Sequence, residues 1–203
     1  GLNCDLATQL CVDENGNSLV KALLLNCCFA TYTDESGNYI DLYGETNVGI
    51  IADKYDEFLF NEVNSDGTAL KPRDYIKSDK AQSFLNFGAP LEECEQRQAD
   101  TVYYKEYDGR EAMRVIYTPS YNHPWSHFSK YGAAVTIDFF DEALGSPVNI
   151  SSGNQVWQWK EFFNFIGLVG LAVFAANVAV LLLGLKPFTA LRTEAPARKI
   201  TVK

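Results

Sequence analysis

Residues 47–58, NVGIIADKYDEF, decide the fold, because a short apolar run without charge ends here directly before a cluster of acids. A short continuous apolar run between turn residues is typical of a strand covered on both faces, as the strands of parallel sheets are. Residues 19–28, which end in ALLLNCC, form a second apolar run. The two runs predict a mostly parallel sheet and therefore an α/β fold.

Turn signals place the other elements of the globular part. Residues 101–117 read as two alternating runs joined at Asp108-Gly109, a pair that favours a tight hairpin, so the sheet should gain antiparallel character near its end. Residues 2–17 predict a helix followed by a loop, and residues 33–46 form a polar connection with room for a short helix.

Two helices are predicted from their caps. Residues 78–87 and residues 129–144 each begin with a serine, a preferred N-cap, and each is followed by a glycine, the preferred residue just past a helix end. The spacing of apolar residues makes the second helix amphipathic. The positions expected on its apolar face are Ala133, Ala134, Ile137, Phe140 and Leu144.

Residues 162–185 predict a transmembrane helix. They carry no charge, and roughly 24 residues at about 1.5 Å per residue are enough to cross a hydrocarbon layer of about 30 Å. Trp157 and Trp159 precede the run, where aromatic rings settle at the membrane interface. Basic residues follow it, so the positive-inside bias places the tail in the cytoplasm and the globular part outside the cell. These residues are Lys186, Arg192, Arg198, Lys199 and Lys203.

Composition agrees with a membrane-anchored globular protein. The chain is 47% hydrophobic and 13% aromatic, which is enough to bury a core, and its net charge of -9 argues against nucleic acid as a partner. The expected organisation is a globular domain at 1–148, a juxtamembrane linker at 149–161, a single span at 162–185 and a basic tail at 186–203. The cell membrane is the expected location, with the lipid bilayer as a partner.

The five cysteines, an odd number, form no framework that can be read from their spacing. Cys27 and Cys28 end an apolar run, where cysteine usually behaves as a small buried hydrophobe. The alternative is a disulfide that involves Cys4, Cys11 or Cys94, if the domain is extracytoplasmic.

Polar side chains follow the carboxyl ends of two predicted strands, where functional groups of open parallel sheets collect. Asp56 comes a few residues after the run at 47–52, with Asp53 and Glu57 as rivals. The only two histidines follow the last strand, and we favour His123 because it comes directly after the strand and its loop. His127, nearer the next helix, is the alternative.

A carboxylate beside a histidine suits a catalytic triad, in which the acid holds the imidazole in one tautomer. The third member would be a serine, cysteine or aspartate on a sharp turn from a strand into a helix, but no G-x-S-x-G pattern occurs in the 203 residues. The chain opens with Gly1 in place of methionine and shows no signal peptide. We therefore expect a fragment whose nucleophile lies upstream of residue 1.

The segments VGIIADKYDEFLF, VIYTPSYNHPWSHFSKYGAAVTIDFF and NQVWQWKEFFNFIGLVG together resemble the C-terminal part of a membrane-anchored bacterial branch of the α/β-hydrolase family. The likeness extends from about Val20 to Leu185. In that family the triad follows the order nucleophile, acid, histidine, with the last two in the loops after the final two strands. Asp56 and His123 match those positions. The resemblance implies the C-terminal half of an α/β-hydrolase sheet followed by one transmembrane helix.

The resemblance also implies what the intact parent would do. An esterase, lipase or peptidase-like enzyme of this kind hydrolyses a small-molecule ester or amide and needs no cofactor and no metal. The fragment alone is expected to be inactive. The runner-up is a non-catalytic membrane-anchored ectodomain that keeps the fold and binds a ligand or partner.

A metal site is a third possibility. His123 and His127 are four residues apart and would share one face of a helix, with Asp56 or Glu57 as a further ligand for zinc or iron. Aromatic residues crowd the same loop and could either line an acyl or aromatic pocket or simply pack. They are Tyr121, Trp125 and Phe128.

Overall fold

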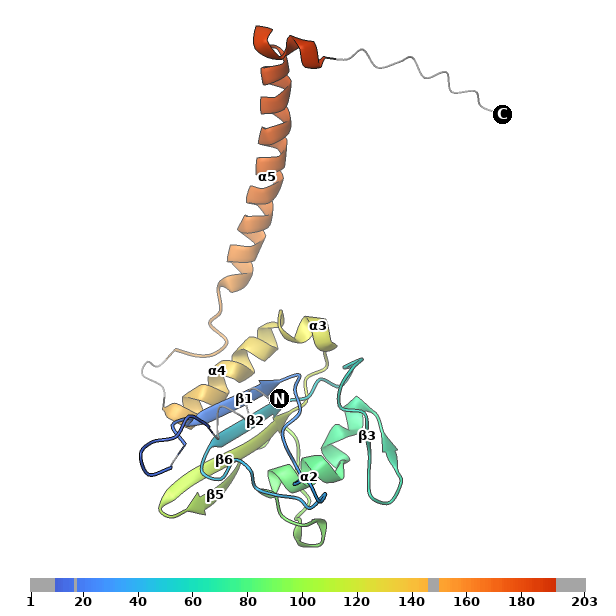
Figure 1. The fold of residues 1–203 in the computed structure, drawn as a ribbon, viewed down its shortest axis with the longest axis vertical. Coiled ribbons are helices and arrows are strands. Elements are labelled where there is room, and N and C mark those ends of the chain that lie inside the picture. The colour runs from blue at the N-terminus through green and yellow to red at the C-terminus, as the bar shows by residue number, and fades with distance from the viewer. Residues whose placement is uncertain (1–9, 17, 146–149, 193–203) are drawn as a thin grey trace, which may run out of the picture. The chain divides into compact units, whose positions relative to one another are not determined.

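The computed structural model describes residues 10–16, 18–145 and 150–192 of the chain (Figure 1). It divides the chain into two units, Gly1–Asn154 and Gln155–Lys203. The first unit is built on a four-stranded mixed sheet with strand order β1-β2-β6-β5, and the second contains one long apolar helix. The predicted α/β class, with mostly parallel strands followed by one candidate span, is confirmed at this level.

Three parallel strands form the centre of the sheet. β1 (Ala22–Asn26) pairs with β2 (Asn47–Ile51), and β2 pairs with β6 (Arg110–Tyr117), all in the same direction. β5 (Tyr103–Tyr107) is antiparallel to β6, and the predicted hairpin turn Asp108-Gly109 joins them with φ of 45° and 85°. Because parallel strands share a direction, the carboxyl ends of β1, β2 and β6 meet at one edge of the sheet.

The two first strands differ in burial. Residues 48–51 of β2 are buried, as the apolar run predicted for a strand between two neighbours. β1 is mostly half-exposed, and only Leu25 is buried within it. Both faces of β1 are nevertheless covered, as predicted, although β1 lies at one edge of the described sheet: Leu23 and Leu25 pack into the core on one face, and Ala22 and Leu24 pack on the other.

A layer of helix covers each face of the sheet. α2 (Asp79–Leu85), with the preceding turn η1 (Pro72–Lys77), packs on one face through residues that include Tyr75, Phe84 and Leu85. On the other face α4 (Lys130–Leu144) packs on β1 and β2. Its Phe139 joins a smaller cluster with Met113 and Val115 of β6.

Gly49 of β2 allows α4 to approach the sheet closely. A Cβ atom at this position would lie 2.7 Å from Cε2 of Phe139 and 2.8 Å from Cδ1 of Leu24. These distances are far inside van der Waals contact. A side chain of any size is therefore excluded where the helix crosses the strand.

Both predicted helix starts are confirmed. The Ser78 hydroxyl accepts the N–H of Ala81 at 3.1 Å, and the Ser129 hydroxyl accepts the N–H of Gly132 at 2.8 Å. α4 spans Lys130–Leu144, and its predicted apolar face is correct only in part. Phe140 packs against the core, but Ile137 and Leu144 are exposed, because the buried stripe is rotated to neighbouring positions of the helix. The buried residues are Gly132, Val135 and Phe139.

The polar segments differ from expectation. Residues 33–46 form turns and a bridge between Thr33 and Tyr39 in place of the short helix. Most of the helix predicted at 2–17 lies outside the described residues, and the described part forms an antiparallel bridge from Val12 to Ser18.

β3 (Glu62–Val63), β4 (Ala69–Leu70) and η2 (Leu91–Glu93) are three short elements that form in segments for which the sequence predicts neither a strand nor a helix. β3 and β4 form an antiparallel hairpin that turns at Gly67, where φ is 86°. The turn η2 follows α2. All three elements lie within the first unit of the chain.

α5 (Trp157–Leu183) is a continuous helix of 27 residues that is long and apolar enough to cross a membrane. It begins inside the segment predicted as a linker, so both interfacial tryptophans are helical. A short turn, η3 (Lys186–Leu191), follows it, and the predicted tail from residue 193 onward lies outside the described residues.

Candidate active site

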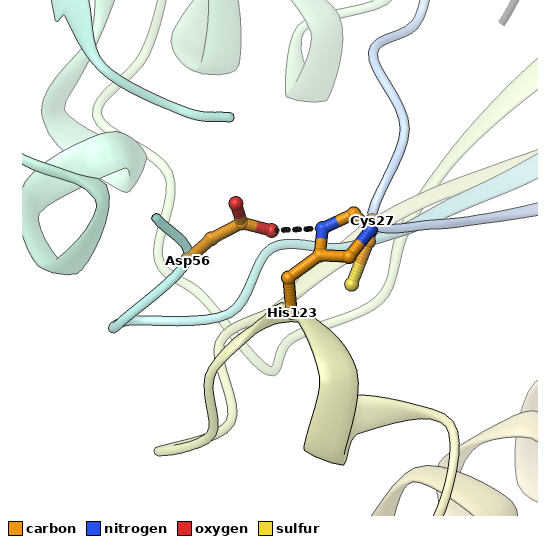
Figure 2. A group of neighbouring side chains, drawn as sticks. All are labelled: Cys27, Asp56 and His123. Carbon is orange, nitrogen blue, oxygen red and sulfur yellow. Dashed lines mark hydrogen bonds and ion pairs between the residues drawn. The ribbon is translucent and has the colours of Figure 1, made fainter. Parts of the chain in front are cut away.

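Three functional side chains meet beyond the carboxyl ends of the three parallel strands. Cys27 is the first residue after β1, Asp56 follows β2 after a short turn, and His123 opens the short helix α3 (His123–Ser126) after β6. Potential ligand atoms of the three residues lie within 4.8 Å of one another (Figure 2). Each strand therefore contributes one member of the cluster.

The predicted contact between Asp56 and His123 is present. Nδ1 of His123 lies 2.8 Å from Oδ2 of Asp56, whose side chain is fully buried. The other carboxylate oxygen accepts the backbone N–H groups of Phe58 and Leu59, each at 2.8 Å. Both oxygens are therefore held, and the carboxylate cannot rotate freely.

Asp56 is charged in this environment. Burial alone would raise the pKa of its carboxyl group, but the hydrogen bonds from Phe58, His123 and Leu59 outweigh burial and leave the pKa below its usual value. A charged carboxylate can only accept, so the proton on Nδ1 of His123 points at Asp56. Nε2 of the neutral ring is then an acceptor, which is what a general base requires.

Backbone hydrogen bonds hold the acid loop and the histidine loop together. The pairing of β2 with β6 continues past the strands, because Lys54 N donates to Pro119 O at 2.9 Å and Tyr55 N donates to Tyr121 O at 3.1 Å. The side chain of Asn122 caps α3 by accepting the N–H of Trp125 at 3.2 Å. His123 is thus placed by main-chain geometry.

The two rival acids also reach the cluster, in other roles. Oε2 of Glu57 accepts the backbone N–H of His123 at 3.2 Å, which fixes the start of α3. Oδ2 of Asp53 accepts the thiol of Cys27 at 3.3 Å. Oδ1 of Asp53 is buried without a hydrogen-bond partner among the described residues. Burial raises the pKa of Asp53, although hydrogen bonds from Ser126 and Cys27 oppose this.

Cys27 is the member that sequence reasoning missed. It is buried, at 3% exposure, as expected for a small hydrophobe, but its thiol donates to the carboxylate of Asp53 and lies near that of Asp56. The pKa of the thiol is raised to about 12, mainly by burial and also by the charges of Asp53 and Asp56, while a Ser126 hydrogen bond acts in the opposite direction. The signal that could have found it is position: Cys27 follows the end of a parallel strand, as Asp56 does.

No disulfide joins the described cysteines to one another. These are Cys11, Cys27, Cys28 and Cys94. The alternative of a disulfide therefore finds no pair among them, and Cys4 lies outside the described residues.

His127 lies beside the cluster. It caps the C-terminus of α3, its Nδ1 is 3.3 Å from Nδ2 of Asn26, and its ring centroid is 5.9 Å from that of His123. In the described part of the chain, the group with metal-ligand geometry contains Cys27 in place of His127. The sulfur, nitrogen and oxygen atoms of this group are of the kinds that bind zinc in proteins.

The aromatic residues around the histidine are mostly at the surface. Trp125, Phe128 and Phe58 are all largely exposed, and the rings of Phe58 and His123 meet edge to face with 5.6 Å between their centroids. Tyr121 lines a cavity of about 420 Å³ next to the two loops. Its other lining residues are Lys54, Asp100, Thr118, Pro119, Ser120 and Tyr131, so the three clustered side chains do not line it.

Comparison with known proteins gives no relative. No protein-family model, no curated protein and no solved structure matches the chain.

Proposed function

We propose that this protein is a membrane-anchored acyl hydrolase of the α/β-hydrolase type, and that Asp56 and His123 are the acid and the base of its catalytic triad. The observation that carries the proposal is the 2.8 Å hydrogen bond between them, which joins residues 67 positions apart in the chain. A charged carboxylate that holds Nδ1 of a histidine leaves Nε2 free to take a proton, as acyl transfer requires.

The proposed reaction is hydrolysis of a small-molecule ester or amide. His123 takes the proton of the nucleophile through Nε2 while the nucleophile attacks the carbonyl carbon, and it returns that proton to the leaving group. In the second half, His123 takes a proton from water, which attacks the acyl intermediate, and it returns this proton to the nucleophile as the acid is released. Asp56 stabilises the imidazolium formed in each half.

The sequence resemblance puts the nucleophile upstream of residue 1. The position of β1 is compatible with this expectation, since its other side pairs with no strand of the described sheet. The length and composition of α5 support a membrane anchor, and the basic residues after it support a globular domain outside the cell.

Two histidine variants test the proposal. The full-length protein, purified in detergent micelles, is assayed with p-nitrophenyl butyrate as wild type, His123→Ala and His127→Ala. We expect His123→Ala to lower kcat/KM by about 10³-fold or more and His127→Ala to lower it less than about tenfold. Unchanged near-ultraviolet circular dichroism shows that both variants are folded.

Two outcomes contradict the proposal. Wild-type protein without turnover on short esters and amides would favour the runner-up, a non-catalytic ectodomain that binds a ligand or partner. Equal losses at both histidines, reversed by added zinc, would favour the metal site.

A further inference from the structure

We infer that the Cys27 thiol is the nucleophile that the Asp56–His123 pair serves, so that the acyl intermediate is a thioester. The inference rests on the proposed function and names the group that attacks the substrate. It differs from the sequence expectation, because the nucleophile then lies within the described chain.

The first support is the place of Cys27 in the fold. β1, β2 and β6 are parallel neighbours, and each ends at a member of the cluster, in the chain order nucleophile, acid, histidine. Cys27 itself has a φ of 48°, in the left-handed region that residues with a side chain rarely adopt. Its N–H donates to Ile51 O at 3.1 Å, which holds the strained turn against β2.

Strain of this kind is informative at this position. The left-handed region is unfavourable for a residue other than glycine, and such residues concentrate at functional sites. A sharp turn directly after a strand also lifts a side chain out of the sheet, towards groups that follow the neighbouring strands. Asn26, one residue earlier, ends the regular strand.

The second support is the direction of the imidazole. Nδ1 of His123 is occupied by Asp56, and the opposite ring nitrogen lies on the side of Cys27 (Figure 2). A ring nitrogen of His123 and the sulfur of Cys27 lie within 4.8 Å of each other, and the proposed step requires the cysteine side chain to turn from Asp53 towards Nε2. The His123 side chain is 30% exposed, which leaves the imidazole side of the cluster open to a substrate.

The chemistry must begin from a protonated thiol, because Cys27 donates to Asp53 and two carboxylates lie nearby. In the proposed step the S–H proton moves to Nε2 of His123 as sulfur bonds to the carbonyl carbon. The bond from that carbon to the leaving oxygen then breaks, and His123 protonates the alcohol. Water, deprotonated by His123, attacks the thioester, and the thiolate recovers the proton as the acid leaves.

The test uses the full-length protein in detergent micelles with p-nitrophenyl acetate. Wild type, Cys27→Ala, Cys27→Ser and the matched neighbour control Cys28→Ala are mixed with substrate, quenched in acid, digested and sequenced by mass spectrometry. We expect an acetyl group on Cys27 that neutral hydroxylamine removes. Cys28→Ala should keep the adduct, and Cys27→Ala should lose it together with about 10³-fold or more of turnover.

The serine variant supplies a signature that a structural role would not. If residue 27 forms the acyl intermediate, Cys27→Ser should carry an oxygen ester that resists neutral hydroxylamine and hydrolyses more slowly. Thermal unfolding of each variant shows whether it is folded, and the mass of the wild-type adduct remains decisive where Cys27→Ala is not.

The outcomes separate this inference from the proposed function. Cys27→Ala with wild-type turnover, beside an inactive His123→Ala, overturns the thiol nucleophile and leaves the acyl hydrolase standing with a nucleophile elsewhere. An acetyl group found on another residue and not on Cys27 leads to the same conclusion. Turnover that survives both substitutions overturns both proposals. Stoichiometric zinc held by Cys27, with activity lost on chelation, overturns the thioester.

Discussion

The Cys27 thiol donates a hydrogen bond to Oδ2 of Asp53 across 3.3 Å, and the second oxygen of the same carboxyl group is buried without a partner in the described part of the chain. A buried carboxylate without a full set of donors is unfavourable in its charged form. The same charge disfavours ionisation of the thiol. The charged carboxylate therefore keeps the thiol protonated, whereas the thiol hydrogen bond opposes the effect of burial on Asp53.

Asp53→Asn should stabilise the protein at neutral pH. The pKa of Asp53 is raised in the folded state, so its contribution to stability is complete below the unfolded value of about 3.9 and is lost as pH rises through the folded pKa. Asparagine cannot ionise and avoids that loss. Thermal unfolding should show a higher midpoint for the variant at pH 7, and a smaller difference at pH 4. A variant less stable than wild type at pH 7 would refute this reading.

Asp56→Asn should have the opposite dependence. The pKa of Asp56 is lowered, so its stabilising contribution is present above the unfolded pKa and is lost as pH falls through the folded pKa. The variant should be less stable than wild type at pH 7, and the difference in stability should become smaller as the pH falls. Turnover should fall by about 10³-fold or more, because the His123 ring is no longer held in the tautomer with its proton on Nδ1. Glu57→Gln, which keeps an acceptor for the His123 N–H, is the control. Equal turnover in the two variants would contradict the role of Asp56.

Gly49→Ala should destabilise the first unit. The new methyl group would lie 2.7 Å from the ring of Phe139 and 2.8 Å from Leu24, and overpacking of this kind costs about 1–3 kcal/mol. Gly153→Ala is the matched control, because its Cβ would lie 3.6 Å from the nearest atom. Urea denaturation measures both variants. A loss no larger than that of the control would mean that α4 does not pack on β2 as described.

Leu171→Arg should weaken membrane insertion of α5. The position lies near the middle of the 27-residue helix, where an arginine costs about 2.5–3.5 kcal/mol on insertion scales. Leu171→Ala keeps the helix apolar and is the control. Carbonate extraction of membranes should leave wild type and the alanine variant in the pellet and release part of the arginine variant. Identical partitioning of all three would argue that α5 does not span the bilayer.

Local signals predicted much of the fold. Ser78, Ser129 and the Asp108-Gly109 pair act on neighbouring residues, so their effect is visible in the sequence, and all three appear as predicted. Burial depends on distant packing and was harder to predict. Leu24 and Leu25 give β1 the composition of a central strand, yet the strand lies at an edge, which no local pattern reveals. The Asp66-Gly67 pair favours a tight turn and is the local sequence feature that indicates the β3–β4 hairpin.

The site was predicted in part for the same reason. Asp56 and His123 stand out because acids and histidines are rare at the ends of apolar runs, and parallel topology brings them together. Cys27 also follows the end of a parallel strand, but a cysteine at the end of an apolar run is usually a buried hydrophobic residue. The sequence therefore did not distinguish it as a site residue. The left-handed turn that exposes its role is a property of the backbone.

Two hydrogen bonds beyond the strands, from Lys54 to Pro119 and from Tyr55 to Tyr121, use main-chain atoms only. The spacing of acid and base is therefore independent of the side chains at those four positions. Substitutions at these positions can change the surface next to the site without changing the distance between Asp56 and His123. The fold can therefore accept new side chains beside the site, through natural drift or directed evolution towards new substrates.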